Sequence, residues 1–283
     1  MGVVYDLNGE TEKAIAEFEK SVGVENNYAA HLRLGANYAR LGDLPRALKE
    51  LDLVLAADPK NVQARYLRAL IYSTQKDFDK AADEYEAILQ SFSSADPANI
   101  EIYGYLGQLY YSQRQYPKAI KQFETILSLD PKNTDVLFLL GTLYLEVNDR
   151  TKAIELLRRA VKINPDYDVC LNSLAYIYAE DGMNLDEAEQ FAERAIAIDP
   201  DNGAYLDSLG WVYFKKGEYD KALKYLLQAD SILKDPVIYE HLGDVYHRMK
   251  REDDAKKYWQ QSLQLLPSQP QVVEKLRALA PQQ

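Results

Sequence analysis

DNGAYLDSLGWVYFKKGEYDKAL, residues 201–223, sets Gly210 directly against Trp211 in the middle of a run that has the spacing of a helix. Neighbouring residues on a helix point about 100° apart, so these two side chains face different ways. The arrangement predicts that Gly210 packs closely on a partner helix. Trp211 is then expected to point to an adjoining side, where it lines a groove.

The same arrangement recurs along the whole chain. A small residue returns every 33 to 38 residues, with a Tyr three residues later and an Ala about twelve residues later. The small residues are Gly35, Ala69, Gly107, Gly141, Ala175, Gly210 and Gly243, and Gly2 fits the same pattern. A helix pair of this length cannot bury its apolar face alone, so the period predicts stacked units that depend on their neighbours.

These positions resemble the tetratricopeptide repeat, a helix-turn-helix unit, over almost the whole chain. The resemblance implies an all-α fold: a right-handed superhelix, or α-solenoid, of about eight repeats, with a C-terminal capping helix. A single solenoid is predicted over 1–283, with repeats at 1–27 (partial), 28–61, 62–99, 100–133, 134–167, 168–202, 203–235 and 236–269, and the capping helix at 270–280. Because Met1 stands directly before the first small residue, the first repeat is truncated, and we expect the chain to be the C-terminal part of a longer protein.

Composition excludes several classes of function. The formal net charge of −11 argues against nucleic acid as a partner, since phosphate binding needs clustered Lys and Arg. Residues 168–235 carry 14 Asp and Glu against 6 Lys and Arg, which indicates either a solvated acidic surface or attraction for a basic partner. The apolar runs are too short for a membrane span, so no direct membrane insertion is expected. The lone Cys170 allows no internal disulfide.

Catalytic and metal-binding motifs are absent from the sequence. No phosphate-binding Gly loop, zinc-protease motif or nucleophile elbow occurs. His241, Asp244 and His247 lie three residues apart, but this spacing spreads them too far around a helix to favour zinc. The sequence therefore predicts a protein that is not an enzyme, with no cofactor and no metal.

One side of each first helix is predicted to form a groove. Positions six, three and two before the small residue, and one, four and five after it, share one arc beside the packing face. The resemblance implies that this arc lines the concave surface. Aromatic and short polar side chains there suit a protein or peptide ligand. The predicted groove residues are Tyr66, Tyr105, Gln108, Tyr111, Phe138, Thr142, Asn172, Tyr176, Asp207, Trp211, Phe214 and Asp244.

Trp211 is expected to be an anchor of this groove, with a loss of about 2 kcal/mol of binding on change to Ala. The alternative is that the rings pack between neighbouring first helices and never meet a ligand. Two ligand modes of related repeats are not expected. Asp207, Glu240 and Asp244 stand where a Lys/Arg/Asn clamp would hold a carboxylate, and the asparagine ladder of the related sugar transferases is missing.

Residues 168–280 resemble the C-terminal part of repeat proteins of the Gram-negative envelope, several of which are lipoproteins. The D-S-L-G-W stretch, the lengthened turn at 179–189 and Trp259 carry this likeness. The resemblance implies a scaffold or adaptor in the periplasm or at the outer membrane, with a protease or an envelope assembly as partner. A cytoplasmic peptide-binding scaffold and the non-catalytic arm of a larger enzyme stay open as alternatives. The oligomeric state and the identity of the partner are not specified by the sequence.

Overall fold

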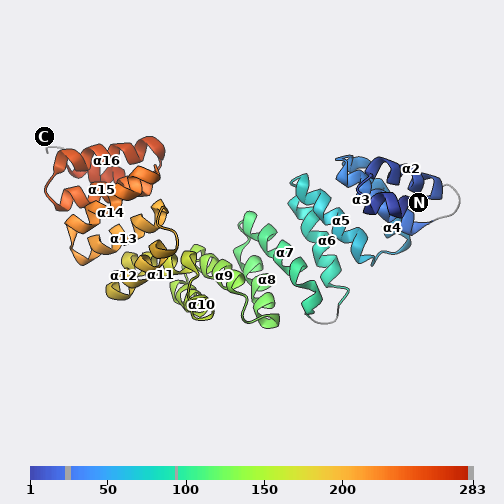
Figure 1. Ribbon diagram of the computed structural model, residues 1–283, viewed down its shortest axis with the longest axis horizontal. Helices are drawn as coiled ribbons and strands as arrows, with labels where there is room; N and C mark the ends of the chain where they lie inside the picture. Colours follow the sequence, from blue (N-terminus) through green and yellow to red (C-terminus); the bar gives the residue numbers. More distant parts are fainter. Residues whose placement is uncertain (23–26, 93–94, 280–283) are drawn as a thin grey trace. The chain divides into compact units, whose positions relative to one another are not determined.

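Consecutive antiparallel helix pairs build the chain (Figure 1). The computed structural model describes residues 1–22, 27–92 and 95–279, and within these ranges the regular elements are all helical. The first helices are α1 (Gly2–Leu7), α3 (Tyr28–Arg40), α5 (Val62–Thr74), α7 (Ile100–Ser112), α9 (Thr134–Glu146), α11 (Asp168–Asp181), α13 (Gly203–Lys216) and α15 (Pro236–Arg248). The second helices are α2 (Thr11–Val22), α4 (Leu44–Ala57), α6 (Phe78–Leu89), α8 (Tyr116–Leu129), α10 (Arg150–Ile163), α12 (Leu185–Ile198), α14 (Tyr219–Ile232) and α16 (Glu252–Leu265). The predicted all-α fold of stacked helix pairs is confirmed.

The helices form two compact units, residues 1–131 and 132–283. We call them the first and the second unit and describe each by itself; a single solenoid over 1–283 stays a prediction. In the first unit, a short 3-10 turn, η1 (Pro97–Asn99), precedes α7. In the second unit, α17 (Pro270–Ala278) lies where a capping helix is predicted at 270–280.

Three predicted boundaries fall partly outside the described residues. These are residues 23–26 at the end of the partial first repeat, residues 93–94, and residue 280 of the capping helix. Residues 93–94 lie in the predicted turn at 92–99, which is lengthened because the repeat 62–99 has four residues more than its neighbours. The other lengthened turn, at 179–189, is described throughout. There Gly182 ends α11 in the left-handed region, with φ of 64°, and α12 begins at Leu185.

Short polar side chains begin many of the helices. The Asn61 side chain accepts a hydrogen bond from the backbone N–H of Ala64 at the start of α5, and Asp43 does the same for Arg46 in α4. These caps satisfy backbone donors that the first turn of a helix leaves unpaired. They explain why Asn and Asp recur in the turns between helices.

Where the small residue of a repeat is Gly, it lies against the second helix of its own pair. A Cβ added at Gly210 would lie 2.7 Å from Leu226 on α14, and one added at Gly141 would lie 2.9 Å from Leu157 on α10. No side chain fits at these positions without displacing its neighbour. The packing role that the spacing predicts is thus confirmed for the repeats whose small residue is Gly.

In at least four repeats, the repeat Tyr forms a hydrogen bond with the second helix of the preceding repeat: these are Tyr38, Tyr110, Tyr178 and Tyr213. Tyr213 Oη donates to Glu189 on α12, 2.8 Å away, while Lys221 lies over the Tyr213 ring at 4.8 Å from its centroid. The first unit has the same contact, in which Tyr110 donates to Glu86 on α6. In both cases the acidic residue precedes the Tyr by 24 positions. We call this contact the tyrosine joint, and it ties a first helix to the second helix of the preceding repeat.

None of the helices in the described ranges combines the length and the apolarity that crossing a bilayer requires.

Candidate functional site

The arc predicted on the first helices contributes to several pockets, and we describe three that contain residues of the predicted groove. One of these three lies in the first unit and two lie in the second. We name each after an aromatic residue in its wall: the Tyr66 groove, the Tyr176 pocket and the Trp211 pocket.

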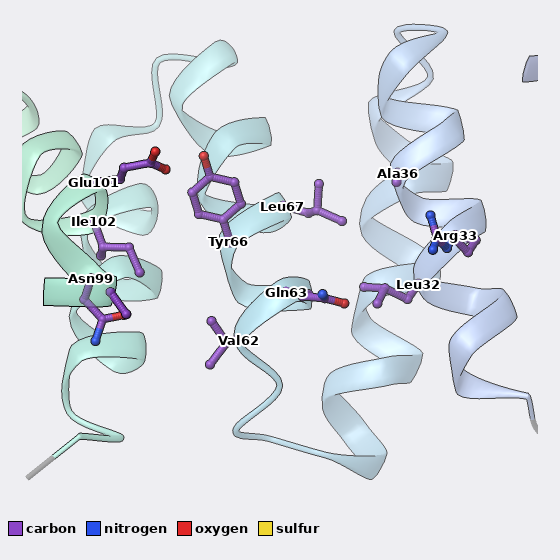
Figure 2. A pocket seen from close by; sticks show the side chains of 11 residues that line it. Leu32, Arg33, Ala36, Val62, Gln63, Tyr66, Leu67, Asn99, Glu101 and Ile102 are labelled. Atoms are coloured by element: carbon purple, nitrogen blue, oxygen red, sulfur yellow. The ribbon is translucent and has the colours of Figure 1, made fainter. Parts of the chain in front are cut away.

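The Tyr66 groove, of about 480 Å³, runs across three successive first helices (Figure 2). Figure 2 shows the side chains of α5 in the middle, flanked by those of α3 and by those of η1 and α7. The wall is mainly apolar, with one Arg and one Glu. It consists of Leu32, Arg33, Ala36, Val62, Gln63, Tyr66, Leu67, Ala98, Asn99, Glu101 and Ile102.

Asn99 is the unusual polar residue of the Tyr66 groove. Its side chain belongs to a residue only 5% exposed, and its Nδ2 atom has no hydrogen-bond partner among the residues that the structure describes. A buried polar group left unpaired costs about 1 to 3 kcal/mol. The wall of the groove therefore holds a buried hydrogen-bond donor, which a ligand can pair with once the Asn99 side chain turns towards the groove.

Tyr66 is held by two other tyrosines. Its ring centroid lies 6.2 Å from that of Tyr85 and 6.0 Å from that of Tyr105. A hydrogen bond with Tyr105, together with burial and the charge of Glu101, raises the pKa of Tyr66 to about 12. The hydroxyl therefore stays protonated at neutral pH and remains a hydrogen-bonding group.

The Tyr176 pocket, of about 330 Å³, lies between α11, α13 and the connection from α14 to α15. It brings together three residues that the sequence places in one groove, Asn172, Tyr176 and Asp207. The Oδ1 atom of Asn172 is buried and, in the described part of the second unit, accepts no hydrogen bond. The remaining wall consists of Leu145, Ser173, Ile177, Ala204, Ser208, Leu233, Asp235, Val237 and Ile238.

The Trp211 pocket, of about 560 Å³, lies between α13, α15, α16 and α17. It brings together Trp211, Phe214 and Asp244. Asp244 accepts hydrogen bonds from Trp259 Nε1 at 3.0 Å and from Lys275 Nζ at 2.7 Å. The other wall residues are Lys215, His247, Arg248, Ala278 and Leu279.

Trp211 does not stand open to a ligand as its sequence position predicts. The residue is 6% exposed, because its ring is stacked between Phe214, at 4.5 Å, and His241, at 3.9 Å between centroids. Its Nε1 donates to Glu180 on α11 at 2.5 Å. The indole thus connects α11, α13 and α15, which is a packing role, and this corrects the expectation of a freely accessible anchor.

Asp207 and His241 form a buried pair between α13 and α15, with 2.8 Å between Oδ1 and Nδ1. Burial lowers the pKa of His241 and is the largest single effect. The carboxylates of Asp207, Asp244 and Glu240 together outweigh it, so the pKa of His241 lies above its ordinary value.

This raised pKa predicts a pH-dependent stability. A group whose pKa is higher in the folded than in the unfolded state contributes stability that is complete below the unfolded pKa of 6.5. We expect this contribution to be lost as the pH rises through the folded pKa of His241. The free energy of unfolding, measured in urea between about pH 5.5 and pH 9, should therefore fall more steeply in the wild type than in His241→Gln.

His247 provides the control, because its side chain is 44% exposed and pairs with Glu252 at the surface. His247→Gln should keep the pH dependence of the wild type. An equal dependence on pH in the wild type and in His241→Gln would contradict the prediction.

The histidines and Asp244 considered as metal ligands have other partners. His241 pairs with Asp207, His247 with Glu252, and Asp244 with Trp259 and Lys275. In the described ranges, no three His, Cys, Asp or Glu side chains are placed to hold a metal ion.

The other predicted groove residues lie outside the three pockets. Tyr105, Gln108 and Tyr111 are exposed on α7, and Tyr105 contacts the ring of Tyr66. Phe138 packs on Tyr167, with 6.0 Å between ring centroids. The Thr142 hydroxyl donates to the carbonyl of Leu139 in its own helix, at 2.8 Å. The binding role of all twelve residues stays a prediction.

The predicted groove residues are all aromatic or polar, so they do not include the apolar residues of the wall. Leu32, Ala36 and Leu67 occupy three positions of the arc, at three before, one after and two before their small residues. The helical period could have found them. Asn99 could not be found in this way, because it lies in η1, outside the period of α7.

Family models and solved structures agree with this fold. Models described as tetratricopeptide repeat match residues 32–98, 112–175, 170–202, 204–232 and 237–268. A search of curated proteins finds no match. A structure of MamA is 26% identical, with a TM-score of 0.54 over 61% of this chain and 92% of that one.

Two further structures show the likeness of fold at lower identity. A tetratricopeptide repeat protein from Parabacteroides merdae ATCC 43184 is 18% identical, with a TM-score of 0.63 over 89% of this chain and 98% of that one. YrrB, described as a TPR protein with an unusual peptide-binding site, is 24% identical, with a TM-score of 0.56 over 71% of this chain and 97% of that one.

Proposed function

Since the chain belongs to the tetratricopeptide repeat family, we propose that it is a non-catalytic scaffold that binds a peptide segment of a partner protein on its first helices. Recognition by such a scaffold needs apolar pockets for side chains and polar groups for the peptide backbone.

The observation that carries this proposal is the unpaired amide of Asn99 in an apolar groove. When the Asn99 side chain turns towards the groove, the carbonyl of an extended peptide can accept the hydrogen bond that Nδ2 offers. Apolar side chains of the peptide then contact Leu32, Leu67 and Ile102. A ligand that pairs Nδ2 recovers the cost of leaving it unpaired. The wall carries one Arg and one Glu, so their charges balance. We therefore expect the groove to prefer neither acidic nor basic peptides.

For the biological role, we propose delivery or assembly of a partner in the bacterial envelope, by the resemblance of residues 168–280. A cytoplasmic scaffold and the non-catalytic arm of an enzyme are the alternatives. A peptide in a groove of this kind is expected to bind with micromolar affinity, about −8 kcal/mol.

Peptide selection followed by variants of the groove tests the proposal. Peptides selected from a random library on the intact chain should bind Asn99→Leu and Tyr66→Ala at least about tenfold more weakly than the wild type. Asn99→Leu should unfold at the same urea concentration as the wild type or at a higher one, because it removes an unpaired polar group.

Gln90→Ala is the control, since Gln90 is exposed after the second helix α6, outside the groove. It should bind the selected peptides like the wild type. Wild-type affinity in both groove variants, or failure of the library to yield any peptide, would argue against binding in the Tyr66 groove.

A further inference from the structure

The polar atoms of the Tyr176 pocket are mainly hydrogen-bond acceptors. Ser173 Oγ donates its proton to the Val169 carbonyl at 2.7 Å, and Ser208 Oγ donates to the Ala204 carbonyl at 3.1 Å. Both hydroxyls therefore offer a ligand their lone pairs and no proton.

Three further acceptors join these hydroxyls in the wall. Asp207 and Asp235 contribute carboxylates, and Asn172 contributes the buried Oδ1 that accepts no hydrogen bond within the described second unit. A ligand rich in donors is the one that satisfies such a wall.

The charge of the wall also favours a ligand that donates hydrogen bonds, and in particular a positively charged one. The described residues that line the pocket include two Asp and neither Lys nor Arg. Burial raises the pKa of the Tyr176 hydroxyl, and the negative charges of Glu180, Asp207 and Glu240 raise it further. The pocket therefore lies in a region of negative potential.

Nearby cations are held by other carboxylates. Lys234 Nζ lies 2.7 Å from Asp230, and Arg150 pairs with Asp181. Asp207 pairs with His241, and the described wall residues include no Lys or Arg that could pair with Asp235. Asp235 uses one oxygen to cap α15, at 2.7 Å from the backbone N–H of Val237.

The rest of the wall suits the stem of a long side chain. Leu145, Ile177 and Ile238 are apolar, and Tyr176 offers an aromatic ring. Long basic side chains bury their methylene groups against such surfaces, and their charged ends bind to carboxylates and aromatic faces.

We infer that the Tyr176 pocket receives a Lys or Arg side chain of the bound partner segment. The inference rests on the proposed peptide binding and specifies the chemistry of the partner in the second unit. It assigns the acidic excess of residues 168–235 a role in selecting a basic partner.

Three pools of fluorescein-labelled nonapeptides test this, with random flanks and Lys, norleucine or Glu fixed at the centre. Norleucine keeps the alkyl stem and removes the charge. By fluorescence anisotropy with the intact chain, the Lys pool should bind about tenfold more tightly than the norleucine pool, and the Glu pool should bind most weakly.

Variants of the wall residues test whether the Tyr176 pocket causes the tighter binding of the Lys pool. Asp235→Asn keeps a side chain that can cap α15 but removes the charge, so the advantage of the Lys pool should fall to about threefold or less. Asn172→Asp adds a carboxylate at the unpaired acceptor and should increase that advantage. Asp201→Asn, an exposed change outside the pocket, makes the same change in net charge and should leave the advantage as it is in the wild type.

Failure of this inference differs from failure of the proposed function. Equal binding of the Lys and norleucine pools, or an equal loss in Asp201→Asn and Asp235→Asn, would overturn the basic pocket while peptide binding stands. Absence of binding by all three pools would overturn peptide binding itself. Far-ultraviolet circular dichroism of each variant establishes that it is folded.

Discussion

Changing Trp211 to Ala is expected to lower the free energy of unfolding by about 3 to 5 kcal/mol, as for other buried tryptophans. The indole is 6% exposed, is stacked between Phe214 and His241, and donates a hydrogen bond to Glu180. Its removal leaves a cavity where α11, α13 and α15 meet and leaves a carboxylate without its donor. Urea unfolding followed by circular dichroism at 222 nm measures the loss.

Two further variants test whether the loss of stability comes from the buried indole and its hydrogen bond. Trp211→Phe keeps an aromatic ring in the stack but loses the hydrogen bond, so it should lose less stability than the Ala variant. Tyr111→Ala removes an aromatic side chain that is 45% exposed and should change stability by less than about 0.5 kcal/mol. If Trp211→Ala unfolds like the wild type and loses peptide binding instead, the indole is a ligand anchor after all.

Changing Gly243 to Ala is expected to destabilise the second unit by about 2 to 3 kcal/mol. The new Cβ would lie 2.3 Å from the Cδ1 and Nε1 atoms of Trp259. That ring cannot easily move, because Trp259 is 2% exposed and its Nε1 donates to Asp244. The helices α15 and α16 would have to separate, and thermal or urea unfolding would detect this.

The same substitution at Gly104 should have the opposite effect and raise the free energy of unfolding. There the nearest atom to a new Cβ is Ile126 Cδ1, at 4.0 Å, which is an ordinary contact. Ala stabilises the interior of a helix by up to about 1 kcal/mol relative to Gly, so Gly104→Ala should raise stability. A loss of stability in both variants, or in neither, would contradict the close-packing account.

The sequence predicts those features of the molecule that depend on the period of a helix. Gly210 faces its partner helix at Leu226, as its position in the repeat requires, and the arc that carries Tyr66 and Asn172 contributes to the pockets. The packing face and the arc can both be predicted from one helix at a time, because 3.6 residues per turn determine which side chains share a face.

The burial of Trp211 depends on more than one helix. Its position on α13 is readable from the period, but the His241 ring that covers it belongs to α15, 30 residues later. How closely α15 approaches α13 is determined by packing between repeats, which no local pattern encodes. The unpaired amide of Asn99 has the same origin, since it lies in a turn whose path depends on the repeats on both sides.

The tyrosine joint also bears on how such a chain changes its length during evolution. Each joint takes its carboxylate from one repeat and its phenol from the next, as in Glu86 with Tyr110 and Glu189 with Tyr213. A duplicated block such as residues 62–99 carries Tyr72 at its front and Glu86 near its end. The Tyr of the copy would follow the original Glu86 by 24 positions, and the Glu of the copy would precede Tyr110 by 24 positions. Duplication of such a block can therefore add a repeat while both joints keep a phenol and a carboxylate.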